Sequence, residues 1–237
     1  FNFSKVLNIG ATEARGEFLC LLNDDIEVLT TSWIEEMICW LQVEGVGAVG
    51  AKLLYPDKSI QHAGITLGLN GLCDHLEKNS QKESFDFNSR ISFPRSFSAV
   101  TGACLMTTRK IFDQVNGFDE CFAEAFNDVD FCLRVKTAGF KIVFSPFCKF
   151  FHHESVSVGK NFLKKRVHTF RKEINLLANR YDSIFFNDPF YSPNHSNVRP
   201  YFNFAFLPRI SSPSYTEISY SRTTILFHYI AVEKLAY

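Results

Sequence analysis

The stretch Phe18-Leu19-Cys20-Leu21-Leu22-Asn23-Asp24-Asp25 decides the fold that the sequence predicts. Its five apolar residues follow one another without interruption and end abruptly in three polar ones. A strand that is buried on both faces of a parallel sheet has this composition. The polar residues then lie at the carboxyl end of the strand, which is the edge where open α/β sheets bind ligands. We therefore expect Asp24 and Asp25 to face a ligand-binding crevice.

Strand and helix patterns alternate along the next 120 residues. Ile34, Met37, Ile38 and Leu41 recur at the spacing of one helical face, after a serine that can cap a helix. Further apolar stretches predict strands at 46–54, 99–106 and 141–144, and helices are predicted at 109–116 and 128–138. This alternation predicts an α/β domain built on a mostly parallel sheet with flanking helices.

The composition excludes several classes of protein. Of the 237 residues, 46% are hydrophobic and 21% are charged, which excludes a disordered or fibrous chain. No apolar run approaches the ~18 residues that a membrane-spanning helix needs. The seven cysteines are an odd number, and several have apolar neighbours, so we expect reduced core thiols in a cytoplasmic protein. These expected core thiols are Cys20, Cys39, Cys104 and Cys132.

Charge divides the chain near residue 160. Residues 1–159 carry 20 acidic and 14 basic side chains, a net charge of −6, whereas residues 160–237 carry 5 acidic and 11 basic ones, a net charge of +6. Six of these cations lie between Lys160 and Lys172, along an apolar helical stripe. They favour either the solvated face of a helix that packs on the domain or a contact with an anionic membrane surface. The asymmetry predicts at least two functional regions.

Two acidic pairs are candidates for chemistry. Asp24 and Asp25 suit a hard divalent cation, which takes carboxylate oxygens together with substrate phosphates, although a solvated turn explains the same residues. Asp128 and Asp130 open a predicted helix. A carboxylate there can serve as a general base, or it can simply interact with the positive end of the helix dipole. Asp130 is the first alternative if Asp128 is not the base.

Two further segments are candidates for ligand binding. His152 and His153 follow the strand predicted at 141–144, and neighbouring side chains of an extended chain point in different directions, so only one imidazole would reach a given metal. A surface or core histidine pair explains them equally well. Thr101-Gly102-Ala103-Cys104 consists of small residues, which allow either a ligand or a helix to approach the backbone closely.

The order of these motifs resembles the family 2 glycosyltransferases, of the type that builds bacterial surface polysaccharides. The resemblance covers about residues 1–206 and does not extend to the remaining C-terminal residues. It rests on Phe1-Asn2-Phe3-Ser4-Lys5, Asn8-x-Gly10-Ala11, Gly16-Glu17-Phe18-Leu19, Leu22-Asn23-Asp24-Asp25-Ile26-Glu27-Val28, Gln61-His62-Ala63-Gly64, Thr101-Gly102-Ala103-Cys104, Gly117-Phe118-Asp119-Glu120, Phe126-Asn127-Asp128-Val129-Asp130-Phe131-Cys132-Leu133-Arg134, His152-His153-Glu154-Ser155 and Asp188-Pro189-Phe190-Tyr191-Ser192-Pro193-Asn194.

The resemblance implies a GT-A fold, which is a nucleotide-binding α/β domain that uses a divalent metal. Family members begin with a strand and a helix that hold the nucleobase, and this chain starts after them. We therefore expect an N-terminally truncated catalytic domain at 1–158, a basic helical extension at 159–207 and a tail at 208–237. Many members have Glu before the catalytic base, where this chain has Asn127.

The resemblance also implies roles for individual residues. Asp25 fills the metal-binding place of the DxD-type motif, for Mn²⁺ or Mg²⁺, and Asp24 lies near the donor ribose or the metal. His152 completes the metal shell, with His153 the weaker candidate. Asp128 fills the place of the catalytic base. The donor-sugar pocket is lined by Gly102 and Ala103.

The implied reaction moves a sugar from a nucleotide-sugar donor to a hydroxyl of a glycan or lipid-linked acceptor, in one inverting displacement. Two alternatives are a sugar nucleotidyltransferase, which also uses Asp pairs with Mg²⁺, and a non-catalytic fragment. We expect no nucleic-acid partner. The expected location is the cytoplasm, with a peripheral contact between the 160–172 helix and the inner face of the membrane.

Overall fold

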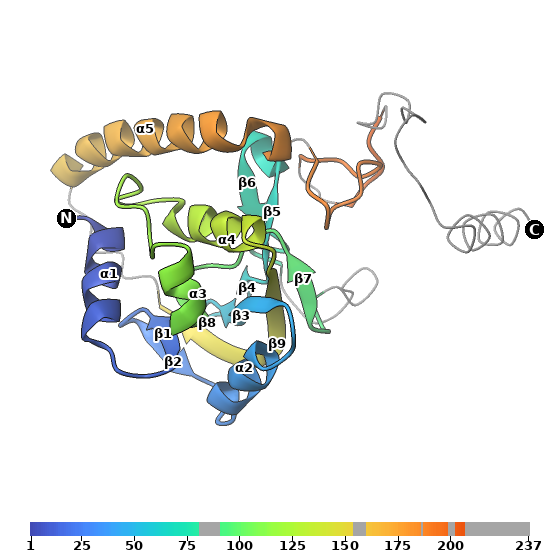
Figure 1. Ribbon diagram of the computed structural model, residues 1–237. Coiled ribbons are helices and arrows are strands. Elements are labelled where there is room, and N and C mark those ends of the chain that lie inside the picture. The colour runs from blue at the N-terminus through green and yellow to red at the C-terminus, as the bar shows by residue number, and fades with distance from the viewer. Residues whose placement is uncertain (81–90, 154–159, 186, 199–201, 207–237) are drawn as a thin grey trace, which may run out of the picture.

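The computed structural model describes residues 1–80, 91–153, 160–185, 187–198 and 202–206 (Figure 1). Its helices are α1 Phe3–Glu13, α2 Trp33–Leu41, the short 3-10 helix η1 Leu69–Gly71, α3 Arg109–Gln114, α4 Asn127–Thr137 and α5 Lys160–Phe185. Its strands are β1 Phe18–Leu22, β2 Ile26–Val28, β3 Val46–Leu54, β4 Ile60–His62, β5 Ile65–Leu67, β6 Cys73–His75, β7 Arg95–Phe97, β8 Cys104–Thr108 and β9 Lys141–His152. The tail predicted at 208–237 lies outside the described residues.

A mixed sheet forms the centre of the molecule. In the described residues it has seven strands in the order β1-β8-β3-β9-β2, with β4 attached to β3 and β7 attached to β9. The predicted α/β architecture with flanking helices is confirmed. The expectation of a mostly parallel sheet is wrong, because β3 and β9 are parallel but the other pairings of this sheet are antiparallel. An apolar run indicates that a strand is buried, but it does not indicate whether the neighbouring strand is parallel or antiparallel.

Three strands nevertheless run in one direction. β8 is antiparallel to both β1 and β3, and β9 is parallel to β3. The carboxyl ends of β1, β3 and β9 therefore lie at the same edge of the sheet. The segment Asn23–Asp25 leaves β1 at this edge and leads into β2, where Ile26 pairs with His152 at the end of β9. The topology thus brings the predicted Asp and His candidates together.

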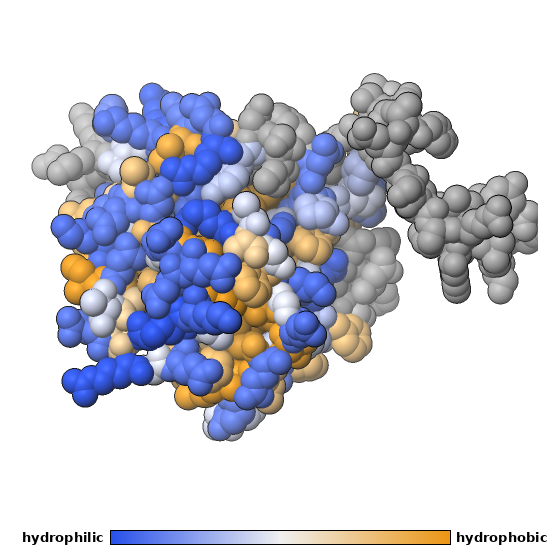
Figure 2. Space-filling model, viewed as in Figure 1, coloured by the Kyte–Doolittle hydropathy of each residue, from blue (hydrophilic) through white to orange (hydrophobic). Residues whose placement is uncertain are grey.

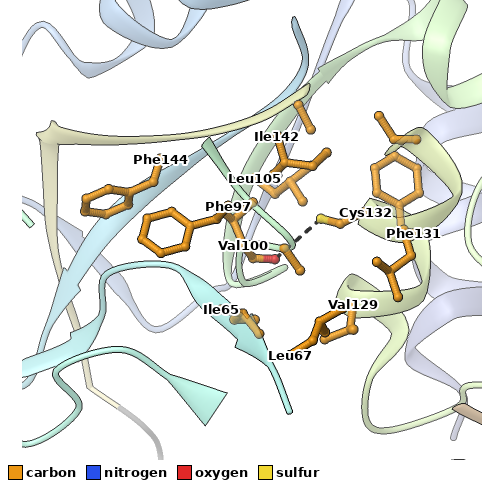
Figure 3. Packing of buried hydrophobic residues seen from close by; sticks show 14 of the residues in the cluster. Ile65, Leu67, Phe97, Val100, Leu105, Val129, Phe131, Cys132, Ile142 and Phe144 are labelled. Carbon is orange, nitrogen blue, oxygen red and sulfur yellow. Dashed lines mark hydrogen bonds between the residues drawn. The ribbon is translucent and has the colours of Figure 1, made fainter. Parts of the chain in front are cut away.

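Apolar layers cover both faces of the sheet. α2 contributes Met37 and Leu41 to one layer, and the other layer contains residues of α1, α3, α4 and α5. Figure 3 shows part of this second layer, in which the Phe97 and Phe144 rings pack edge to face with their centroids 5.8 Å apart. The sheet is therefore a stable platform for the residues at its carboxyl edge.

β1 lies at the end of the strand order, and burial alternates along it. Leu19 and Leu21 are buried, whereas Cys20 and Leu22 are exposed, because in the described structure the helices cover only one face at this strand. Two of the expected core thiols are therefore on the surface. Cys20 and Cys39 are exposed, while Cys104 and Cys132 are buried as expected.

The face of the molecule in Figure 2 is mostly hydrophilic, with apolar residues gathered near its centre and towards α2. Within the described residues, no helix has both the length and the apolar composition that crossing a membrane requires.

α5 lies on the same side of the molecule as α4 (Figure 1). The α4 residue Asp130 is completely buried at their contact, where it accepts hydrogen bonds from Arg134 Nε at 2.7 Å, Arg180 Nη1 at 2.6 Å and the Tyr181 hydroxyl at 2.8 Å. Leu177 of α5 is completely buried in the apolar layer. These contacts hold the C-terminal half of α5 against the domain. The boundary between 1–158 and 159–207 stays a prediction.

The centre of β3 leaves no room for a side chain at Gly50. A Cβ added there would lie 2.4 Å from the Val100 Cβ. It would also lie 2.7 Å from each of the two Val100 methyl carbons, which Val100→Ala removes. We expect Gly50→Ala to lower the free energy of unfolding by about 1–3 kcal/mol through overpacking. In a double-mutant cycle, Val100→Ala should cost less in the Gly50→Ala background than in the wild type. The control is Gly10→Ala in α1, where nothing lies within 4 Å and the change should be neutral or stabilising. Equal effects at both glycines in denaturant unfolding would contradict this account.

The buried network at Asp130 generates a second stability prediction. Asp130→Asn leaves Arg134 without its carboxylate and leaves Arg180 with that of Asp119, 2.7 Å away. We expect the free energy of unfolding to fall by about 3 kcal/mol, the lower end of the cost of breaking a buried ion pair, because both guanidinium groups are partly exposed. Urea unfolding measures the loss. Asp113→Asn is the matched control on α3, because Asp113 is exposed and should tolerate the change. A loss no larger than that of the control would show that the network is not stabilising.

Candidate active site

An open cleft of about 310 Å³ lies at the carboxyl edge of β1 and β9. Asp25 lies beside it, with its Oδ1 atom 3.0 Å from His152 Nε2. The resemblance assigns first-choice roles to six residues, and the structure brings five of them together. Gly102, Ala103, Asp128 and His152 line the cleft, and Asp25 lies next to it. The cleft is lined by Phe1, Phe3, Asn23, Thr101, Gly102, Ala103, Glu124, Asn127, Asp128 and His152.

Asp128 lies in the first turn of α4 and faces the cleft. The Gly102 N–H donates a hydrogen bond to its Oδ2 atom at 2.9 Å, and the Val129 N–H donates to Oδ1 at 2.8 Å. Burial raises the pKa of Asp128 above its ordinary value, and the backbone donors partly oppose this rise. A half-buried carboxylate with a raised pKa, held by the backbone at the edge of a cleft, suits proton abstraction. Asp130 does not line the cleft.

His152 connects the end of β9 to both β4 and the Asn23–Asp25 segment. Its Nδ1 atom lies 2.6 Å from Gln61 Oε1, and because an amide oxygen only accepts hydrogen bonds, Nδ1 carries the proton. Its Nε2 atom lies 3.0 Å from Asp25 Oδ1 and 3.3 Å from Asn23 Nδ2. With its proton on Nδ1, the ring directs the Nε2 lone pair towards a carboxylate oxygen, and a cation in contact with both atoms would relieve their repulsion.

His153 and Asp24 are oriented differently from their neighbours. His153 Nε2 lies 2.9 Å from Glu27 Oε2, and both of these side chains are about half exposed. The two adjacent histidines thus reach different acidic residues, as expected of an extended chain. Asp24 is exposed and is absent from the described lining of the cleft, where Asn23 of the same segment is present.

β4 supplies two supporting side chains that the sequence analysis quoted only as part of a motif. Gln61 fixes the imidazole of His152, as described above. His62 is completely buried, and its Nε2 atom accepts hydrogen bonds from the Gly64 and Thr101 N–H groups, each at 3.3 Å. Burial lowers the pKa of His62 well below its ordinary value, so the ring stays a neutral acceptor. It thereby holds the segment that contains Gly102.

The segment before α4 also depends on residues that had no assigned role. Asn127 is buried, and its Oδ1 atom accepts a hydrogen bond from the Asp128 N–H at 2.7 Å. The amide oxygen of this departure from the family pattern therefore binds the backbone of the candidate base. Glu173 of α5 is 2% exposed and accepts hydrogen bonds from three consecutive backbone N–H groups, at 123–125. The signal in the sequence is that Glu173 directly follows the cations at 160–172, which no other acidic residue interrupts.

The donor set next to the cleft fits a hard divalent cation. Within the described residues, no three His, Cys, Asp or Glu side chains gather as a complete metal site. Asp25 Oδ1 and His152 Nε2 are nevertheless 3.0 Å apart, which matches neighbouring ligands of an octahedral ion with bonds of about 2.1 Å. Mg²⁺ and Mn²⁺ sites take few protein ligands and fill the remaining positions with substrate phosphates and water. The tautomer that Gln61 imposes leaves Nε2 available for such an ion.

Comparison with curated proteins finds bacterial relatives. The chain is 41% identical over 195 residues to the uncharacterized protein y4gI of Sinorhizobium fredii. This match covers 82% of the chain and 22% of the relative. It is 36% identical over 161 residues to the O-antigen biosynthesis protein RfbC of Myxococcus xanthus, which covers 66% of the chain and 12% of the relative. The chain thus spans less than a quarter of the length of these two relatives.

A shorter match covers 62 residues, with 37% identity, of the N-acetylglucosaminyl-diphospho-decaprenol L-rhamnosyltransferase of Mycobacterium tuberculosis. It covers 26% of the chain and 20% of that protein. No family model matches the chain.

Comparison with solved structures supports the fold. The crystal structure of GalNAc-T7 with UDP, GalNAc and Mn²⁺ matches with a TM-score of 0.51 at 14% identity, covering 72% of the chain and 35% of that structure. At this identity the likeness concerns the fold alone, and the predicted GT-A type is confirmed. Fold and sequence together identify the chain as a relative of bacterial glycosyltransferases that has the GT-A fold.

Proposed function

We propose that this chain is the catalytic region of a metal-dependent, inverting glycosyltransferase of family 2. The substrates are a nucleotide-sugar donor and a hydroxyl of a glycan or lipid-linked acceptor. The observation that carries the proposal is the meeting of two kinds of group at one cleft: the Asp25–His152 pair and the carboxylate of Asp128.

Asp128 is the general base of the proposed reaction. Its carboxylate is held by the Gly102 N–H, and its raised pKa makes it a stronger proton acceptor than an ordinary aspartate. It takes the proton of the acceptor hydroxyl while that oxygen forms its bond to C1 of the donor sugar and the bond from C1 to the diphosphate breaks. One carboxylate is enough for a single displacement, and the configuration at C1 inverts.

The charges around the cleft explain why the reaction needs a cation. Glu124 and Asp128 line it, and no Lys or Arg is among its described lining residues. A donor diphosphate bound there would lie close to the acidic side chains Glu124 and Asp128. Asp25 and His152 would hold Mn²⁺ or Mg²⁺. When bound, the metal neutralises the charge that develops on the departing nucleoside diphosphate.

The remaining residues have positioning roles in the proposal. Gly102 has no side chain and Ala103 has only a methyl group, which leaves space at the cleft for the donor sugar. Asp24 contacts the ribose or the metal hydration shell from its exposed position beside Asp25. The name of the M. tuberculosis relative includes a decaprenol diphosphate, which supports a lipid-linked acceptor. The cations at 160–172 would then contact an anionic membrane.

The sugar nucleotidyltransferase is less favoured, because its chemistry needs no base next to an acceptor hydroxyl and the M. tuberculosis relative is named a rhamnosyltransferase. Product analysis separates the two activities, since a nucleotidyltransferase forms a sugar nucleotide and releases pyrophosphate.

Removal of the Asp25 carboxylate tests the metal site. We expect Asp25→Asn to weaken Mn²⁺ binding, measured by titration calorimetry, at least tenfold and to abolish Mn²⁺-stimulated turnover, because a hard ligand is lost. Glu27→Gln is the matched control, since Glu27 forms the analogous contact with His153 away from the cleft. The control should bind Mn²⁺ as the wild type does. Equal effects of the two substitutions, or none from Asp25→Asn, would contradict the site.

Removal of the base tests the chemistry. We expect Asp128→Asn to bind nucleoside diphosphate with Mn²⁺ normally and to lose about 10²–10⁴-fold in turnover of sugar nucleotides, because an amide cannot accept the proton.

The pH profile gives an independent test of the same base. Asp128 must be ionised to act, and its pKa is raised, so kcat/KM should fall with falling pH along a limb that lies above 3.8, the ordinary pKa of Asp. The residual activity of Asp128→Asn should lack this limb. An unchanged limb in that variant would assign it to another group.

A further inference from the structure

The segment between α3 and α4 brings Asp128 to the cleft without being a helix or a strand itself. Its residues from Asp119 to Phe126 form turns and bends. A segment of this kind has no hydrogen-bonding ladder, so its backbone groups need partners elsewhere. Two distant parts of the chain supply these partners in this molecule.

α1 binds the carbonyl groups of the segment. The Phe3 N–H donates to the Ala123 carbonyl at 2.7 Å, Asn2 Nδ2 donates to the Glu120 carbonyl at 2.8 Å, and the Ser4 hydroxyl donates to the Phe122 carbonyl. Phe3 also lines the cleft. One side of the segment is thus fixed next to the candidate active site.

α5 binds the N–H groups of the same segment through a single carboxylate. Glu173 Oε1 accepts from the Ala123 and Glu124 N–H groups at 2.7 and 3.1 Å, and Oε2 accepts from the Ala125 N–H at 2.8 Å. The side chain is 2% exposed, so water competes little for these bonds. Hydrogen bonds to an ionised acceptor are stronger than those between neutral groups.

The last residue of the segment shows why such fixing is needed. Phe126 caps the N-terminus of α4 with φ at 58°, in the left-handed region that residues with a side chain rarely adopt. Its ring lies against Phe170, three residues before Glu173 on α5, with the centroids 5.3 Å apart. The next two residues, Asn127 and Asp128, line the cleft. Any rotation at Phe126 would therefore displace the Asp128 carboxylate.

We propose that Glu173 is a positioning residue for catalysis, through which α5 holds the segment at 123–125 and thereby sets the place of Asp128 in the cleft. This inference rests on the proposed function of Asp128 as the base. It makes α5 part of the machinery that transfers the sugar. It also explains why this acidic residue is buried directly after Arg171 and Lys172, which are exposed.

The test compares Glu173→Gln with Leu177→Ala in the intact protein. Leu177 is completely buried on the same helix, one turn further on, and it makes no hydrogen bond to the segment, so its truncation loosens α5 packing without removing the carboxylate. The measurements are turnover across a panel of sugar nucleotides with Mn²⁺, affinity for UDP and GDP with Mn²⁺, and hydrogen exchange of the amides at 123–128.

We expect Glu173→Gln to lower kcat at least tenfold and to leave the affinity for the nucleoside diphosphate with Mn²⁺ within about twofold. Exchange should accelerate at 123–128 more than in the sheet. Leu177→Ala should accelerate exchange to a similar extent at 123–128 and in the rest of the domain. Its kcat should be higher than that of Glu173→Gln when the two variants have similar melting temperatures. A wild-type kcat in Glu173→Gln, or an equal loss of kcat in the two variants, would overturn the inference.

A milder variant covers the case in which Glu173→Gln does not fold. Phe170 is 47% exposed, so Phe170→Ala should fold, and the loss of its contact with Phe126 should lower kcat by a smaller factor with the same unchanged nucleotide affinity. Wild-type kcat and exchange in this variant would then count against the proposal. If the wild-type protein turns over no sugar nucleotide, the proposed function fails, and the exchange data alone decide whether α5 holds the segment.

Discussion

The common direction of β1, β3 and β9 is the constraint on which the candidate site depends. Because these strands end at one edge of the sheet, the segment that follows Leu22 and the residue that ends β9 meet there, although 129 residues separate Asn23 from His152. β8 lies between β1 and β3 in the opposite direction, and it delivers the Gly102–Ala103 segment to the same edge from its own amino end. The Asp25–His152 pair and the Gly102–Ala103 segment depend on this arrangement, and Asp128 of α4 joins them through the Gly102 N–H.

Supporting contacts then decide what each of these groups can do. Gln61 sets the tautomer of His152, so that the nitrogen facing Asp25 is the one able to bind a cation. The Gly102 N–H orients Asp128, while burial makes its carboxylate more basic. The acidic side chains Glu124 and Asp128 line the cleft, and no Lys or Arg is among its described lining residues. This electrostatic setting supports the proposed division of labour between a metal and a base.

α5 extends the site beyond the sheet. Asp130 and Glu173 are both buried acids, but their partners differ: Asp130 joins two helices through guanidinium groups and a hydroxyl, whereas Glu173 binds the backbone of an irregular segment. The first contact docks the helix, and the second transmits its position to the residues at the cleft. The sequence predicts α5 as a separate basic extension, but Glu173 connects it to the segment that precedes the candidate base Asp128.

The sequence by itself predicted the α/β class and the approximate positions of the main strands and helices, because apolar periodicity is local. Its ordered motifs made Asp25, Gly102, Asp128 and His152 candidates for the site, and their roles stay predictions. The sequence did not determine the direction of the sheet strands, the exposure of Cys20 on an edge strand or the orientation of Asp24. Pairing partners and helix coverage are non-local, and an apolar run looks the same beside either kind of neighbour. The role of Glu173 also needed the tertiary structure, because its three donors lie about 50 residues away, in a segment without periodicity.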